Sequence, residues 1–133
     1  MPGDIDVKVV FNRLPRLSRE MEAKVADVVK EHAFAAKADM QAQMAQSKSG
    51  HWYGKHQASA PGEAPAIDTS ELVNSLGAKA LKRLVWIVWA GAEYAIHLEY
   101  GTVKMAARPF MRPAAERISK PFFTAMRRAL GRL

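Results

Sequence analysis

Near the start of the chain Ile5, Val7, Val9 and Phe11 alternate with Asp6, Lys8 and Val10, and this period of two then gives way to a helical spacing. The alternation predicts a half-buried strand of about seven residues that ends before Pro15. Ser18 is a good N-cap, and after it a repeat of three or four residues predicts a long helix over about 18–46. The stripe expected to face the core is Met21, Val25, Val28, His32, Ala36, Met40 and Met44.

Strand patterns return after residue 70. Asp68 or Thr69 is expected to cap a short helical turn through 71–73. The segments 76–81 and 84–89 then predict a hairpin joined at Lys82-Arg83, because the second is a dense run of β-branched and aromatic residues. Gly91 interrupts this pattern, and helical spacing predicts a short helix over about 92–100.

A second amphipathic helix is predicted at the end of the chain. Pro113 falls where a first-turn proline is tolerated, and Pro121 is expected to kink the helix. Its apolar stripe, which we expect to cover the strand at 84–89, is Ile118, Phe122, Met126, Ala129 and Leu133. The 133 residues show no internal repeat. They predict one α+β domain over 1–133, with a small antiparallel β-sheet packed with one long N-terminal helix and a C-terminal helix.

A long loop separates the first helix from the hairpin. Residues 47–68 are rich in Ser, Gly, Pro and His, and loops of that length in a small domain are usually functional or disordered. Trp52 and Tyr53 lie within it. Because large aromatic side chains are costly to leave in water, we expect this flexible loop to order on a partner through these two residues.

The net charge of +7 is concentrated after Thr102. Residues 1–103 hold equal numbers of basic and acidic side chains. The remainder has Glu116 as its one acid against the basic Lys104, Arg108, Arg112, Arg117, Lys120, Arg127, Arg128 and Arg132. Such a basic segment favours an anionic partner, which is either a nucleic acid or an acidic protein surface.

Little in the sequence favours catalysis or a cofactor. The chain has no cysteine, which excludes disulfides, thiolate metal sites and cysteine nucleophiles. No phosphate-binding loop or serine nucleophile motif occurs, and the four histidines lack the spacing of a metal site. No segment has the roughly 18 apolar residues of a membrane span, and no signal peptide is evident. We therefore expect a soluble, intracellular, non-enzymatic protein without cofactor or metal.

Three stretches together resemble a known family. The first runs from His56 through Ala60-Pro-Gly-Glu-Ala-Pro65 to Asp68-Thr69, Glu71-Leu72 and Ser75-Leu76. The second is Tyr94-Ala-Ile-His-Leu-Glu-Tyr-Gly-Thr102, and the third is Arg108-Pro-Phe-Met-Arg-Pro-Ala114. Their order and spacing are similar to those of the tail-completion or head-tail joining (neck) proteins of long-tailed bacteriophages, the gp-ten-like tail components. The sequence departs from the family at Ser70, where the family often carries glycine, and in having Pro121 within the last helix.

The resemblance implies a structural virion protein that forms a homo-oligomeric ring, hexameric because tails are six-fold. This ring would join the tail to the head-closure complex, with a head-closure or adaptor protein on one side and the tail tube or tail terminator protein on the other. Weak contact with DNA passing through the lumen is expected, and no membrane contact. The protein would assemble in the host cytoplasm and reside in the virion neck.

The residues themselves suggest where subunits and partners would touch. Glu99, followed by Tyr100, is near Arg108 and Arg112 in sequence, and a carboxylate held by a guanidinium at a subunit contact would set orientation in a ring. The alternative is an ordinary surface pair. Gly101 is expected to supply a positive φ. The expected interface is Trp52, Tyr53, Glu99, Tyr100, Arg108, Arg112, Arg127 and Arg128.

A basic nucleic-acid-binding protein is the alternative function. The basic C-terminal helix and the pI of about 9.9 favour it. Against it, bulky apolar residues such as Phe110, Phe122 and Phe123 interrupt the basic stretch, and no recognition motif is present.

Overall fold

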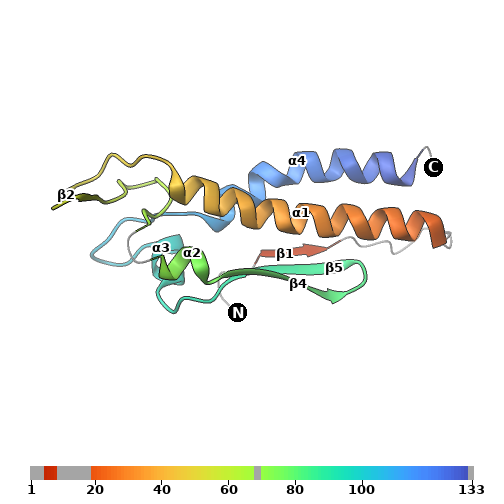
Figure 1. Cartoon of the computed structure of the whole chain (residues 1–133), viewed down its shortest axis with the longest axis horizontal. Helices are drawn as coiled ribbons and strands as arrows, with labels where there is room; N and C mark the ends of the chain where they lie inside the picture. Colours follow the sequence, from red (N-terminus) through yellow and green to blue (C-terminus); the bar gives the residue numbers. More distant parts are fainter. Residues whose placement is uncertain (1–4, 9–18, 68–69, 132–133) are drawn as a thin grey trace.

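The computed structural model describes residues 5–8, 19–67 and 70–131 (Figure 1). The elements in chain order are β1 (Ile5–Lys8), α1 (Arg19–Ala45), β2 (Trp52–Tyr53), β3 (His56–Gln57), α2 (Glu71–Asn74), β4 (Leu76–Lys82), β5 (Val85–Ala90), α3 (Ala95–Tyr100) and α4 (Met111–Leu130). The predicted α+β class is confirmed, with a long N-terminal helix, a C-terminal helix and antiparallel β-structure. The end of the first predicted strand and the caps predicted at Ser18 and at Asp68 or Thr69 lie outside the described residues.

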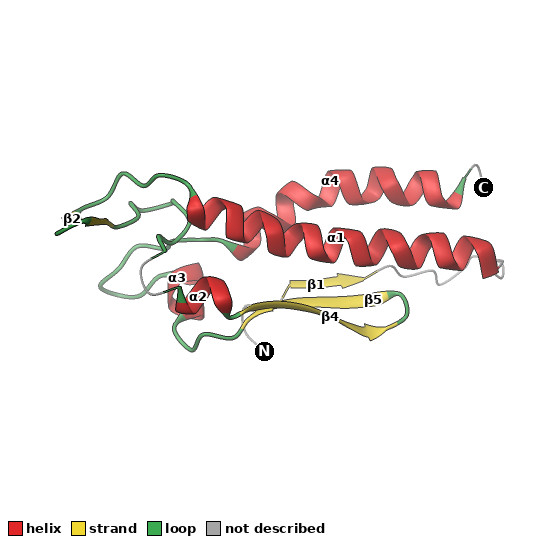
Figure 2. Ribbon diagram, viewed as in Figure 1, coloured by secondary structure: helices red, strands yellow, loops and turns green. Residues whose placement is uncertain are grey.

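The molecule is elongated along α1, with the sheet on one side of this helix and α4 on another (Figures 1 and 2). The main sheet has the order β1-β5-β4 and is antiparallel throughout. Ile5 pairs with Val88 at the β1–β5 contact, and Leu76 pairs with Ala90 at the β4–β5 contact. The strands β2 and β3 form a separate small hairpin that projects beyond the C-terminal end of α1 (Figure 1).

The β4–β5 hairpin turns one residue later than predicted. The turn is at Arg83-Leu84 instead of Lys82-Arg83, and β5 accordingly begins at Val85. The pairing is irregular between Ala80 and Lys82, so β4 contains an extra residue before Lys82 pairs with Val85. A bulge of this kind accommodates one additional residue in one strand of an antiparallel pair.

The buried stripe of α1 contains the predicted Val25, Ala36, Met40 and Met44 and differs from the prediction between Val25 and Ala36. Val29 and Ala33 are fully buried, while the predicted Val28 and His32 are half-buried. The reason is that α1 packs against both the sheet and α4. Its most buried positions are therefore those that lie between the two contacts. His32 lies on the α4 side, where its ring meets Phe122 edge-on at 5.5 Å.

Helix α4 packs chiefly along α1, and not on the sheet as predicted. Phe122 and Met126 are buried in one cluster with Val25 and Val29, and from the hairpin only Leu84 and Trp86 reach this cluster. The sheet is covered by α1 instead, through a second cluster with Val88 at its centre. Its buried members are Ala33, Ala36, Met40, Met44, Leu72, Leu76, Val88, Ala92, Ala95, Phe110, Met111 and Ala114. The helix continues through Pro121, and Pro113 lies in its first turn as expected.

The short helix predicted over 92–100 begins only at Ala95. Residues 93 and 94 form a turn, in which the Ala95 N–H donates to the Ala92 carbonyl at 3.1 Å. This turn and α3 bring the chain to the same end of the molecule as the β2–β3 hairpin (Figure 1). We call this end, formed by residues 46–67 and 94–110, the loop end.

Candidate functional site

Exposed aromatic and large apolar side chains gather at the loop end. Of the nine large hydrophobic residues that are exposed in the described part of the chain, six belong to it. They are Trp52, Tyr53, Ile67, Tyr94, Tyr100 and Val103. Tyrosine and tryptophan are enriched at protein interfaces, and a concentration of exposed apolar side chains marks an interaction surface. The loop end is therefore the best candidate for the functional surface.

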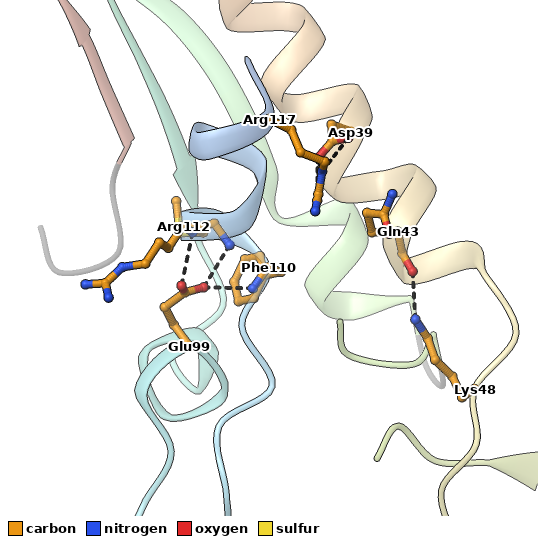
Figure 3. Close-up of polar contacts among 8 residues, drawn as sticks. Asp39, Gln43, Lys48, Glu99, Phe110, Arg112 and Arg117 are labelled. Carbon is orange, nitrogen blue, oxygen red and sulfur yellow. Dashed lines mark hydrogen bonds and ion pairs between the residues drawn. The ribbon is translucent and has the colours of Figure 1, made fainter. Parts of the chain in front are cut away.

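Glu99 holds the loop end together from the inside. Its side chain is only 7% exposed. One carboxylate oxygen accepts hydrogen bonds from the Phe110 and Met111 N–H groups at 2.9 and 2.8 Å, and the other accepts from the Arg112 N–H at 3.1 Å (Figure 3). These amides form the N-terminus of α4, where the helix dipole favours a negative charge. Glu99 thus supplies the cap that Phe110, the N-cap residue, cannot provide with its own side chain.

This arrangement differs from the ion pair that the sequence suggested. In the described structure Glu99 bonds to backbone amides, and the Arg112 side chain extends away from the carboxylate (Figure 3). The Arg108 side chain donates instead to the Ser59 carbonyl and hydroxyl at 3.2 and 3.1 Å, and to the Ala106 carbonyl at 2.8 Å. The expected ion pair is wrong because α3 ends beside the start of α4. The first N–H groups of a helix have no partner within the helix, and here three of them bind the Glu99 carboxylate in place of an arginine.

The loop between α3 and α4 is closed at its base. The Arg108 N–H donates to the Leu98 carbonyl at 2.6 Å, and the Thr102 N–H donates to the Met105 carbonyl at 2.8 Å. Gly101 has φ of 77°, as predicted, and a Cβ there would lie 2.9 Å from both the Ala107 nitrogen and the Met105 oxygen. Only glycine combines that conformation with so close an approach of the backbone.

The long loop after α1 is tied to this closed loop. The Gly62 N–H donates to the Ala107 carbonyl at 3.1 Å, close to the Arg108–Ser59 contact. Consequently the three stretches quoted above for their resemblance meet at one place. Glu99 joins the second stretch to the third, and Arg108 joins the third to the first.

Glu63 fixes the base of the long loop. Its carboxylate accepts from the Ser49 hydroxyl, from the Ser49 N–H at 3.1 Å and from the Ala60 N–H at 2.8 Å. These hydrogen bonds, the Ser49 hydroxyl first, hold the pKa of Glu63 below its ordinary value. Beyond this base only the β2–β3 hairpin projects, with Trp52 59% and Tyr53 65% exposed.

The predicted interface residues fall into two groups. Trp52, Tyr53, Glu99, Tyr100, Arg108 and Arg112 all lie at the loop end or at the adjoining start of α4. Among them, Glu99, Tyr100 and Arg112 line a hollow of about 250 Å³ beside Pro109 and Pro113. Arg127 and Arg128 are exposed in the last turn of α4, at the opposite end of the molecule (Figure 1). There they complement the helix dipole.

Sequence reasoning missed three features of the structure. Glu63 was assigned no role beyond its place in the first resembling stretch, although the three hydrogen bonds that it accepts define the loop base. Arg117 grips Asp39 across the α4–α1 contact, with Nη2 2.7 Å from a carboxylate oxygen (Figure 3). Ser70 adopts φ of 65°, the left-handed conformation that glycine accommodates most easily. The glycine of the resembling family at this position was the available indication of that conformation.

The described residues contain neither a cluster that could hold a metal ion nor a helix that could cross a membrane. Residues 5–8, 19–67 and 70–131 contain no group of three or more His, Cys, Asp or Glu side chains that could hold a metal ion. Within the same ranges, no helix is both long enough and apolar enough to cross a membrane. Comparison of the chain with family models, curated proteins and solved structures found no match.

Proposed function

We propose that this protein is a structural subunit of the neck of a long-tailed bacteriophage, where it forms a ring that joins the tail to the head-closure complex. One observation carries the proposal. The three stretches that resemble tail-completion proteins are spread over residues 56–114, and hydrogen bonds join parts of all three at one loop end that presents exposed aromatic residues. The resemblance alone rested on short motifs, and their spatial convergence supports reading them as one functional unit.

The asymmetry of the molecule supports a ring. One end exposes the aromatic Trp52, Tyr53 and Tyr100, and the other exposes Arg127 and Arg128. Contacts between two unlike surfaces of identical subunits are head-to-tail, and they close into a ring when the rotation permits. We propose six copies, as the tail-completion resemblance implies, with a head-closure or adaptor protein on one side and the tail tube or its terminator on the other.

Complementation tests this proposal directly. In the phage or prophage that encodes the chain, deleting its gene should leave filled heads and separate tails, which electron microscopy distinguishes from joined particles. Wild-type protein supplied from a plasmid should restore joined particles. A Trp52→Ala, Tyr53→Ala double variant should fail to restore them, whereas Phe123→Ala, a matched change of an exposed aromatic on α4, should restore them. Normal joined particles in the deletion strain would refute the proposal.

Nucleic-acid binding is a second candidate function because α4 exposes a row of basic side chains. They are Arg112, Arg117, Lys120, Arg127 and Arg128. Arg117 is engaged with Asp39, which leaves four available. DNA binding measured over a series of salt concentrations separates the two functions. Tight binding with a steep salt dependence and a sequence or structure preference favours the nucleic-acid function, and weak uniform binding is what a ring lumen requires.

A further inference from the structure

A hollow of about 350 Å³ lies at the base of the β2–β3 hairpin, between the hairpin and the end of α1. Met44, Trp52 and Ile67 contribute apolar surface to it, and Lys48, Lys55 and His56 contribute polar groups. Trp52 and Ile67 are 59% and 39% exposed, so a ligand entering the hollow would cover both. The site is thus concave, partly apolar and open.

The charges that line the hollow have one sign. No acidic side chain is among its lining residues, and in the described structure neither Lys48 nor Lys55 forms an ion pair. The Lys48 ammonium donates to the Gln43 carbonyl at 2.7 Å. Its pKa is lowered by burial, with Glu63 opposing that shift. Glu63 therefore offsets part of the charge of Lys48, and Lys55 carries the positive charge of the hollow that no acidic side chain of the described residues opposes.

We propose that this hollow binds an extended acidic segment of a protein partner, with an apolar side chain of the segment against Trp52 and Ile67 and its carboxylates beside Lys48 and Lys55. This inference rests on the proposed function, since the partner would be the adjoining neck protein. Tryptophan is one of the residues that most often carry the binding energy of an interface, and complementary charges fix the register of the bound segment.

The lining favours a protein segment over a nucleic acid. Trp52 with two lysines would also suit a stacked base and its phosphates. Met44, Ala45, Ala66 and Ile67, however, offer aliphatic surface that matches an apolar side chain, and His56 is the one ring in the lining besides Trp52.

Fluorescence anisotropy with the full chain tests the proposal. The probe is a labelled synthetic peptide that alternates leucine with glutamate, and its comparison peptide has every glutamate replaced by glutamine. We expect saturable binding of the glutamate peptide, weakened by salt, and about tenfold weaker binding of the glutamine peptide. Trp52→Ala should weaken binding of the glutamate peptide about 30-fold, the loss typical of an interface anchor. Lys55→Glu should weaken it about tenfold.

Lys120→Glu is the matched control, since it reverses an exposed charge on α4 and should leave peptide affinity unchanged. Equal affinity for both peptides, no saturable binding, or equal losses from Lys55→Glu and Lys120→Glu would overturn the inference. So would tighter binding of an oligothymidylate that Trp52→Ala weakens. Ring formation is measured separately: a ring that ignores the peptide removes this inference alone, and a monomer that binds it removes the neck assignment alone.

Discussion

The contact between Glu99 and the start of α4 predicts a large effect of a small substitution. Glu99→Ala would leave the Phe110 and Met111 N–H groups buried without acceptors, and each unsatisfied buried donor costs about 1–3 kcal/mol. We therefore expect a loss of about 3–5 kcal/mol in the free energy of unfolding, a large part of the roughly 5–15 kcal/mol of a typical domain. Glu99→Gln keeps one oxygen in place but removes the charge and one acceptor, and should cost about 2 kcal/mol.

Urea denaturation followed by circular dichroism measures both losses, and hydrogen exchange locates them. The amides of residues 110–112 should exchange faster in Glu99→Gln than in the wild type, because they lose the charged acceptor. Glu116→Gln removes the same charge from an exposed position on α4 and should change the free energy of unfolding by less than about 0.5 kcal/mol. Equal free energies of unfolding for Glu99→Gln and Glu116→Gln would refute the capping role.

Three further predictions follow from single features. Ser70→Gly should raise the free energy of unfolding by about 0.5–1 kcal/mol, because it relieves a left-handed conformation at φ of 65°; a lower Tm would contradict this. The lowered pKa of Glu63 means that its contribution is complete above pH 4.5, its ordinary value, and is lost as pH falls through the lowered one. The protection of the loop-base amides, expressed relative to their intrinsic exchange rate at each pH, should therefore fall in acid, and a Glu63→Gln variant should lack that fall. Phe122→Ala should cost about 3–5 kcal/mol in urea denaturation, whereas Arg127→Glu with Arg128→Glu should keep the wild-type stability and lose particle assembly. A normal titre of infectious phage from this double variant would show that Arg127 and Arg128 face solvent and make no contact needed for assembly.

The fold was largely predictable because its elements follow apolar periodicity. The long helix and the two hairpin strands depend on local patterns, and each of their observed bounds lies within one residue of the predicted bound. The errors have a common cause, which is tertiary contact. The bulge before Lys82 shifts the turn, and packing of α1 against two layers buries Val29 and Ala33 in place of Val28 and His32.

The candidate site was predictable only in part. Sequence reasoning selected Trp52, Tyr53 and Glu99, because exposed aromatics and an isolated acid near arginines suggest contacts. It did not find the partners of Glu99, because these are backbone N–H groups at the start of a helix. The identity of the side chains does not show which of these groups lack a partner. The role of Glu63 was hidden for the same reason, because two of its three contacts are with backbone amides.

Native mass spectrometry of the full chain over a range of concentrations tests the ring most directly. The chain has a mass of 14.7 kDa, and we expect one closed species of six copies to replace the monomer as concentration rises. The Tyr100→Ala variant and the Arg127→Glu, Arg128→Glu double variant should each shift this equilibrium towards monomer, since they alter opposite ends of the subunit. A wild-type chain that stays monomeric at every concentration, or that forms an open series of dimers, trimers and longer chains, would contradict the account.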